Sequence, residues 1–193
     1  MTEIVGHHVG SWRYGDTVPL HESMMKLAIN IITQTNFGAH FKDKANSDNL
    51  NQQYSSVINE LDDVLNGLWT FGSGDEREEK FEQNLRIFKN EMKKIVIEHR
   101  IRKGDGDFSL APFLDMLLDN LDDEDEIIHQ AITFMIGGFH TTGSYMTWFF
   151  YFLAQRPDIQ RKVREEVRRV RDEEGFTGIN DMKKLVYTRK VMS

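Results

Sequence analysis

One short segment of this chain combines bare backbone with side chains that can hold and move protons. Residues 136–142 read Ile-Gly-Gly-Phe-His-Thr-Thr and lie inside a long apolar stretch. A glycine in the middle of a helix is about 1 kcal/mol less favourable than alanine, so the pair needs a structural or functional reason. Two explanations fit: a ligand approaches the backbone here, or a neighbouring helix packs closely against it.

The two threonines of this segment predict a local change in the helix. A threonine hydroxyl can donate to the carbonyl four residues back, which would join Thr141 to Gly137 and Thr142 to Gly138. We expect the helix to open locally beside a polar patch, as helices do at many functional sites. Three- and four-residue steps place five residues on one helical face: Thr133, Ile136, Gly137, His140 and Thr141.

Two long amphipathic helices are predicted in the first half of the chain. Within residues 50–68 and again within residues 81–99, apolar side chains recur at alternating steps of four and three. A break that contains glycines separates the two segments. The pair could form an antiparallel coiled-coil hairpin, which would make the chain a binding or scaffold protein without catalysis.

A long central helix is predicted over about residues 123–154. Five acids at residues 122–126 suit the positive end of its dipole. Pro157 then favours the first turn of the next helix, where its missing N–H does no harm. No alternating run is long enough to predict a β-strand, so the sequence indicates an all-α fold.

Residues 131–154 are also long enough to cross a bilayer. The stretch contains His140 and several hydroxyl side chains, and it lacks the GxxxG spacing of many packed membrane spans. We therefore favour a buried central helix of an α-helical protein.

Composition indicates a globular chain. Hydrophobic residues make up 39% and charged residues 28% of the 193 residues, with only 3 prolines. The net charge of −7 argues against nucleic acid as the main partner. The absence of cysteine excludes disulfides. No signal peptide or membrane anchor is visible at the N-terminus, so we expect this chain alone to be soluble, with His7 and His8 in a disordered end rather than a metal site.

Three motifs in order resemble the cytochrome P-450 (haem-thiolate monooxygenase) family. Residues 137–142 match 5 of 6 positions of [Ala/Gly]-Gly-x-[Asp/Glu]-Thr-[Thr/Ser], with His140 in place of the carboxylate. A Pro-x-x-Gln-x-x-Val-x-x-Glu-[Ile/Val] helix follows from Pro157, and a Leu-x-Tyr motif ends at Tyr187. Residues 18–41 and the two amphipathic helices loosely resemble the orphan animal family numbered twenty.

The resemblance implies that residues 1–193 are a single incomplete domain, the all-α central part of the cytochrome P-450 fold. The β-rich N-terminal part and the haem-ligand C-terminal part of that fold would be missing. The family holds its haem iron through a cysteine thiolate, and this chain contains no cysteine. The resemblance would place the glutamate of the family's Glu-x-x-Arg motif at the position after Ser193. We therefore expect a fragment that is inactive alone and supplies no metal ligand.

The implied parent enzyme inserts one oxygen atom of O₂ into a lipophilic small molecule. The family's chemistry implies a haem cofactor and NADPH-derived electrons delivered through a partner reductase. It also implies an endoplasmic reticulum membrane location for the parent. The basic residues within 161–171 could meet the redox partner, or they could form an ordinary solvated helix with i,i+4 ion pairs.

By the same resemblance, the polar face of the central helix looks onto the distal side of the haem. Gly137 and Gly138 would lie at the cofactor and make room for O₂, and Thr141 would be the hydroxyl that steers protons. The further expected site residues are His140 and Thr142 for catalysis, and Thr133 and Ile136 for contact with the substrate. His140 could relay protons, since the usual imidazole pKa is about 6.5, or it could only pack or cap a backbone carbonyl.

Overall fold

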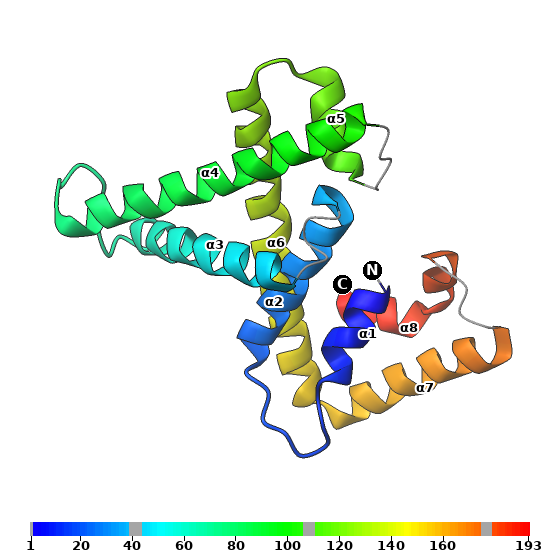
Figure 1. Cartoon of the computed structure of the whole chain (residues 1–193). Helices are drawn as coiled ribbons and strands as arrows, with labels where there is room; N and C mark the ends of the chain where they lie inside the picture. Colours follow the sequence, from blue (N-terminus) through cyan, green and yellow to red (C-terminus); the bar gives the residue numbers. More distant parts are fainter. Residues whose placement is uncertain (1, 39–43, 106–110, 175–178) are drawn as a thin grey trace. The chain divides into compact units, whose positions relative to one another are not determined.

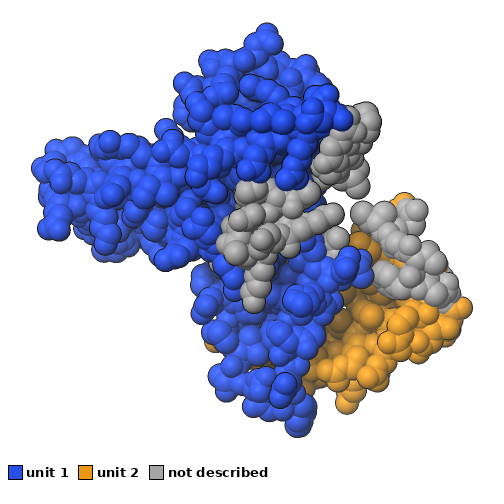
Figure 2. Space-filling view, in the orientation of Figure 1, with its two compact units in different colours: residues 1–143 blue, residues 144–193 orange. Residues whose placement is uncertain are grey.

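The computed structural model describes residues 2–38, 44–105, 111–174 and 179–193 (Figure 1). Within these ranges the chain is helical and contains no β-strand, which confirms the all-α prediction. The chain forms two compact units, residues 1–143 and 144–193 (Figure 2). The long helix α6 (Glu124–Ala154) contributes to both units. The extent of a single incomplete domain over residues 1–193 stays a prediction.

Unit 1 begins with two helices joined by a short loop. Helix α1 spans Thr2–Gly10, so the prediction of a disordered N-terminal end is wrong. The physical reason is a contact that the sequence did not reveal: His8 Nε2 lies 2.9 Å from the Ser23 hydroxyl of helix α2. Helix α2 spans Leu20–Ile32 and continues as the π-helical turn η1, Thr33–Phe37. Gly38 ends this run at φ 86°, a backbone angle that favours glycine.

Helices α3 (Lys44–Leu65) and α4 (Glu76–Gly104) lie side by side in unit 1 (Figure 1). They are the two predicted amphipathic helices. The side chain of Asp75 caps α4 by accepting a hydrogen bond of 2.9 Å from the Glu78 backbone N–H. The buried seam of α4 follows the predicted spacing and consists of Phe81, Phe88, Met92, Ile95, Val96 and His99.

Ion pairs and aromatic contacts stabilise the end of this helix pair at which α3 connects to α4. Arg77 donates to Glu60 at 2.6 Å and also pairs with Asp63. The same guanidinium lies 5.0 Å from the centre of the Trp69 ring, which packs edge-on against Phe71. These contacts hold the segment that connects α3 and α4 against residues of both helices.

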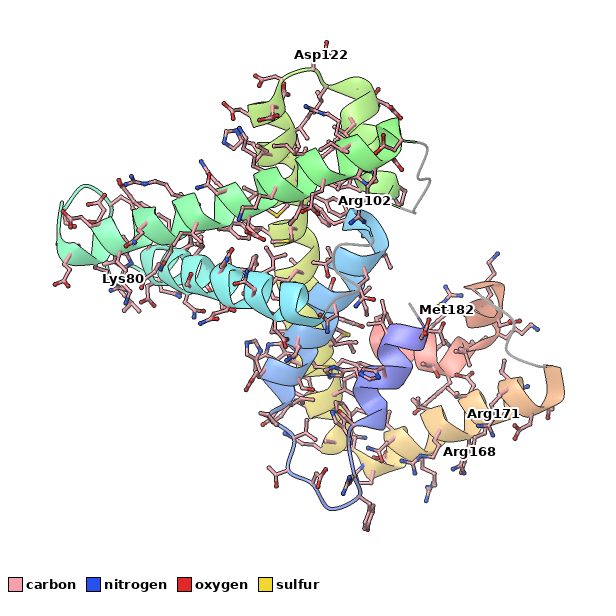
Figure 3. All side chains as sticks on the ribbon, in the orientation of Figure 1. Lys80, Arg102, Asp122, Arg168, Arg171 and Met182 are labelled. Carbon is pink, nitrogen blue, oxygen red and sulfur yellow. The ribbon has the colours of Figure 1, made fainter. Side chains whose placement is uncertain are left out.

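Helix α5 (Pro112–Asn120) leads into the central helix α6 (Glu124–Ala154), close to the predicted bounds of 123–154. Asp122 lies in the turn between them (Figure 3). The first residue of α6, Glu124, is held by two cations of α4: Lys93 at 2.6 Å and Arg100 at 3.5 Å. None of the described helices is both long and apolar enough to span a membrane.

Unit 2 contains the end of α6, helix α7 (Pro157–Glu174), the 3₁₀ helix η3 (Ile179–Lys184) and helix α8 (Val186–Met192). Helix α8 has no buried residue and is held by polar contacts. Glu166 of α7 accepts hydrogen bonds from the backbone N–H groups of Tyr187 at 2.8 Å and Thr188 at 2.7 Å. At the other end, the Tyr145 hydroxyl donates to the Met192 carbonyl at 2.5 Å.

Candidate functional site on the open face of the central helix

Helix α6 has two faces of different character within unit 1. One face is buried and apolar, and aromatic contacts tie it to its neighbours: the Phe139 ring lies 4.3 Å from that of Tyr54 of α3. The members of this buried face are Ile127, Ile128, Ala131, Ile132, Met135, Phe139 and Gly143. On the other side, Thr133, Gly137 and Thr141 follow one another at four-residue steps and are all exposed. The polar segment that the sequence singled out therefore lies largely on the open side.

The three glycines of this region differ in what surrounds them. A Cβ added to Gly137 would meet no described residue within 4 Å, so none of the described helices requires a glycine there. A Cβ on Gly138 would lie 2.6 Å from Ile32 Cδ1, and one on Gly143 would overlap the Met25 sulfur and lie 3.2 Å from the Met25 Cα. Close packing of α2 thus explains Gly138 and Gly143, and it leaves Gly137 as the glycine that packing does not explain.

The threonine hydroxyls follow the prediction only in part. Thr141 Oγ1 donates to the Gly137 carbonyl at 2.6 Å, as expected. Thr142 makes no hydrogen bond to any described residue, so the predicted bond to Gly138 is wrong. The predicted opening of the helix is also wrong, because residues 124–154 are α-helical throughout. A carbonyl oxygen has two lone pairs, so the Gly137 carbonyl can accept the hydroxyl without a break in the helix.

His140 occupies the edge between the two faces. Its side chain is half-buried, and its Nδ1 atom is buried without a hydrogen-bond partner among the described residues. A buried ring nitrogen without a partner is uncommon and calls for an explanation. Capping of a backbone carbonyl, one of the two roles expected for this histidine, is therefore not seen at Nδ1.

The remaining predicted site residues lie near this row without belonging fully to it. Ile136 is half-buried at the same edge as His140, and Gly138 is half-buried beside Ile32. Thr142 is exposed but follows Thr141 directly, which places it about 100° further around the helix. The structure thus brings Thr133, Gly137 and Thr141 together on the open face, with Ile136 and His140 beside them.

The segment of α6 after Glu126 contains no charged side chain. From Ile127 to Ala154 there is no Asp, Glu, Lys or Arg. Charges gather instead at the start of the helix, where a hydrogen bond from Lys93 lowers the pKa of Glu124 and the same contact raises the pKa of Lys93. Any proton chemistry on the open face therefore depends on hydroxyl groups and imidazole.

Two features of the site escaped the sequence analysis. Gly143 packs against α2 as closely as Gly138 does, and only its burial distinguishes it from a solvent-facing glycine. His129 is exposed one turn before Thr133, whose hydroxyl donates to the His129 carbonyl at 2.8 Å. The four-residue spacing of His129, Thr133 and Gly137 could have revealed this row, since residues four apart share a helical face.

The open Gly137 and Thr141 one turn later lie in a segment of α6 without charged side chains, and they occupy positions of the sequence motif that resembles the cytochrome P-450 family. The comparison with known proteins agrees, because the family model for cytochrome P450 matches residues 3–193. The chain belongs to the cytochrome P450 family. This confirms the family that the three sequence motifs indicated.

Several curated relatives resemble the chain over most of its length. Cytochrome P450 20A1 of Bos taurus is 28% identical over 177 residues, which cover 91% of this chain and 37% of that protein. Cytochrome P450 20A1 of Rattus norvegicus is 27% identical over 154 residues, covering 79% of this chain and 32% of that protein. Cytokinin hydroxylase of Arabidopsis thaliana is 27% identical over 192 residues, 91% of this chain and 36% of that protein. The chain therefore spans about a third of the length of these relatives.

Proposed function

We propose that this chain supplies the distal side of the haem site in a monooxygenase that inserts one oxygen atom of O₂ into a lipophilic small molecule. The observation that carries the proposal is Gly137. This residue is exposed and has open space where a Cβ would stand. Its carbonyl accepts a hydrogen bond from the Thr141 hydroxyl. Glycine is unfavourable in a helix, so close approach of a ligand is the remaining reason for it here.

The residues of this face could contact only one of the two sides of a haem. The open surface at Gly137 leaves room for a flat macrocycle, and the lack of charge between Ile127 and Ala154 suits its apolar ring. When bound, the haem supplies the redox chemistry that activates O₂. The chain contains no cysteine, so the thiolate ligand would come from elsewhere in a longer protein, and the 193 residues alone would be inactive.

In this proposal the hydroxyl and imidazole groups handle protons and water. The Thr141 hydroxyl donates a hydrogen bond to the Gly137 carbonyl, so the hydroxyl oxygen is free to accept a hydrogen bond from a ligand or a water molecule. Thr142 and His140 are the further catalytic candidates. Gly138 is proposed to lie near the cofactor, and it also packs closely against Ile32 of α2.

Substrate contact is assigned to Thr133 and Ile136. The Thr133 hydroxyl donates its hydrogen bond to the His129 carbonyl, so the hydroxyl oxygen and the methyl group are available to contact a ligand. Ile136 is half-buried at the edge of the same face. A lipophilic substrate suits this surface, because the charge-free helix offers no ionic partner to a polar one.

Electrons are proposed to come from NADPH through a partner reductase, with the parent protein at the endoplasmic reticulum membrane. Helix α7 offers a basic surface for such a partner, and Arg168 and Arg171 project from it (Figure 3). All of its basic residues are exposed: Arg161, Lys162, Arg164, Arg168, Arg169 and Arg171. An acidic partner surface would be steered toward such a cluster.

The coiled-coil hairpin is the less well supported alternative. Helices α3 and α4 do pack as a pair, but Tyr54 of α3 also packs on Phe139 of α6. The seam of the hairpin is therefore shared with a third helix and is not that of a free-standing module.

A haem-binding experiment separates the two functions. A longer protein that contains this chain and a cysteine-bearing C-terminal part should give a thiolate-type carbon monoxide spectrum, whereas the 193-residue chain alone should not. Gly137→Val should abolish substrate turnover in the longer protein while the melting temperature of the 193-residue chain stays unchanged. Gln130→Val, at another exposed position of α6, is the matched control. A longer protein without haem, or a fully active Gly137→Val variant, would overturn the proposal.

A further inference from the structure

We infer that a cavity between helices α1 and α2 binds a small organic cation, an ammonium group carried on an aromatic or aliphatic body. The cavity lies in unit 1 and has a volume of about 370 Å³, within the range of about 300–1,000 Å³ that small-molecule sites usually have. Its lining residues come from α1, α2 and the loop between them, and none of the described lining residues belongs to α6. The inference therefore concerns a second site, separate from the open face of α6, and it does not depend on a haem.

Polar contacts within the chain hold the walls of this cavity together. His8 Nε2 lies 2.9 Å from the Ser23 hydroxyl, which joins α1 to α2. In the connecting loop, the Arg13 backbone N–H donates to the Asp16 carboxylate at 2.9 Å, and Gly15 takes a φ of 94°. The turn therefore fixes the position of Asp16 on the lining.

Two rings give the cavity an aromatic part. Trp12 packs edge-on against His8, with 5.9 Å between the ring centres and 71° between the ring planes, and both side chains are half-buried. An edge-on contact does not cover both faces of the indole, and an indole face attracts a cation more strongly than the other aromatic rings of proteins do. Val18 and Pro19 add apolar surface to the lining. The body of an organic cation thus finds apolar contacts here.

The charges of the lining favour a cation over an anion. Asp16 and Glu22 contribute carboxylates, and Lys26 contributes the ammonium group of the lining. Lys26 is paired at 3.0 Å with Asp48, which is not part of the lining, so its positive charge is offset from outside the cavity. Glu22 is exposed and forms no ion pair or hydrogen bond with a described residue, so its carboxylate is available to a ligand.

The remaining titratable group, His8, does not oppose a cation. Burial lowers the pKa of its imidazole, and the nearby Lys26 lowers it further, so the ring is mostly neutral at pH 7. A metal ion is not the favoured ligand, because no group of three or more His, Asp or Glu side chains among the described residues could hold one. An organic ammonium needs only a carboxylate and a ring face, and the lining offers both.

A binding experiment on the 193-residue chain tests this site. Benzylamine, which carries an ammonium group at neutral pH, is added while the indole and backbone N–H signals are followed by NMR. The chain has 3 tryptophans, so the Trp12 indole signal can be identified by its loss in Trp12→Leu. The Trp12 indole and the Ser23 amide should shift with a common dissociation constant on the order of 1 mM. Benzyl alcohol, which has a similar shape without the charge, should bind about fivefold more weakly or less.

Two substitutions assign the binding to named side chains. Glu22→Gln should weaken benzylamine binding by about fivefold, the upper end for an exposed ion pair, and Trp12→Leu should weaken it by about threefold. Glu3→Gln changes an exposed acid of α1 outside the lining and should bind like the parent.

Three outcomes would overturn the inference. The first is equal affinity for benzylamine and benzyl alcohol, which would show that charge is not recognised. The second is unchanged affinity in Glu22→Gln with an unchanged melting temperature. The third is a set of shifts confined to Thr133, Gly137 and Thr141, which would place the compound on the open face of α6 and leave the proposed function standing.

Discussion

The two faces of helix α6 use glycine for opposite reasons. On the buried face, Gly138 and Gly143 admit Ile32 and Met25 of α2, and a methyl group at Gly143 would overlap the Met25 sulfur. On the open face, a Cβ at Gly137 would meet no described residue within 4 Å, and the Gly137 carbonyl accepts a hydrogen bond from the Thr141 hydroxyl. Identical residues a few positions apart are thus explained by packing in one case, and by the proposed approach of a ligand in the other.

This difference shows how a structural glycine and a functional glycine can be told apart. A glycine required for packing has a neighbour that a Cβ would strike, so its replacement is felt in stability. A glycine required for a ligand has open space, so its replacement gains helix propensity and is felt only in function. Among the described residues, Gly137 has the open surroundings of the second kind, and its role toward a ligand is the one proposed above.

The largest effect that tests this comparison is expected at Gly143. Gly143→Ala should lower the free energy of unfolding by up to about 2 kcal/mol, because overpacking costs about 1–3 kcal/mol and the gain in helix propensity returns only about 1 kcal/mol. Gly138→Ala should be close to neutral, since the flexible end of Ile32 can move aside. Gly137→Ala should raise stability by about 1 kcal/mol. Urea unfolding measures all three, and a loss at Gly137 equal to that at Gly143 would contradict the assignment.

The second prediction extends the comparison to helix α8, which depends on a carboxylate instead of an apolar face. Burial alone would raise the pKa of Glu166, but hydrogen bonds from Thr188 and Tyr187 outweigh it and the pKa lies below its usual value. The stabilisation is therefore complete above the unfolded pKa of about 4.3 and is lost as the pH falls through the lower folded pKa.

Glu166→Gln should weaken α8 by about 1 kcal/mol, because a neutral acceptor forms weaker hydrogen bonds than a carboxylate. Hydrogen exchange at the Tyr187 and Thr188 amides reports this loss, and acid should reproduce it in the unmodified chain. Exchange at Phe139 on the buried face of α6 serves as the control. Protection at Thr188 that survives both treatments would show that α8 is held in another way.

The smallest effect is expected at Tyr54, the polar member of the otherwise apolar contact with Phe139. Its hydroxyl is buried without a hydrogen-bond partner among the described residues. Tyr54→Phe should therefore be neutral or stabilising by up to about 1 kcal/mol, because it removes an unsatisfied polar group and keeps the ring contacts. Thermal unfolding of the two chains side by side measures it. A loss of 2 kcal/mol or more, taken as about the cost of a lost buried hydrogen bond, would reveal a partner for this hydroxyl.

Much of the fold could be predicted from residue spacing. The seam of α4 from Phe81 to His99 and the bounds of α6 follow from apolar periodicity and from the acids at residues 122–126. The ordered N-terminal helix was missed, because its contact between His8 and Ser23 joins two segments that carry no shared pattern. The opening expected at the glycine pair was wrong, because a carbonyl can serve a backbone N–H and a hydroxyl together.

The sequence by itself determined the positions of the long helices α3, α4 and α6, the family motifs and the hydrogen bond from Thr141 to Gly137. These features depend on propensities and bonds within a few residues of the chain. Only the tertiary structure decided which glycine is packed and which is open, and that the His140 Nδ1 atom has no hydrogen-bond partner among the described residues. The physical reason is that burial depends on which distant side chains reach a helical face, and residues such as Met25 and Ile32 reach α6 only after the chain has folded.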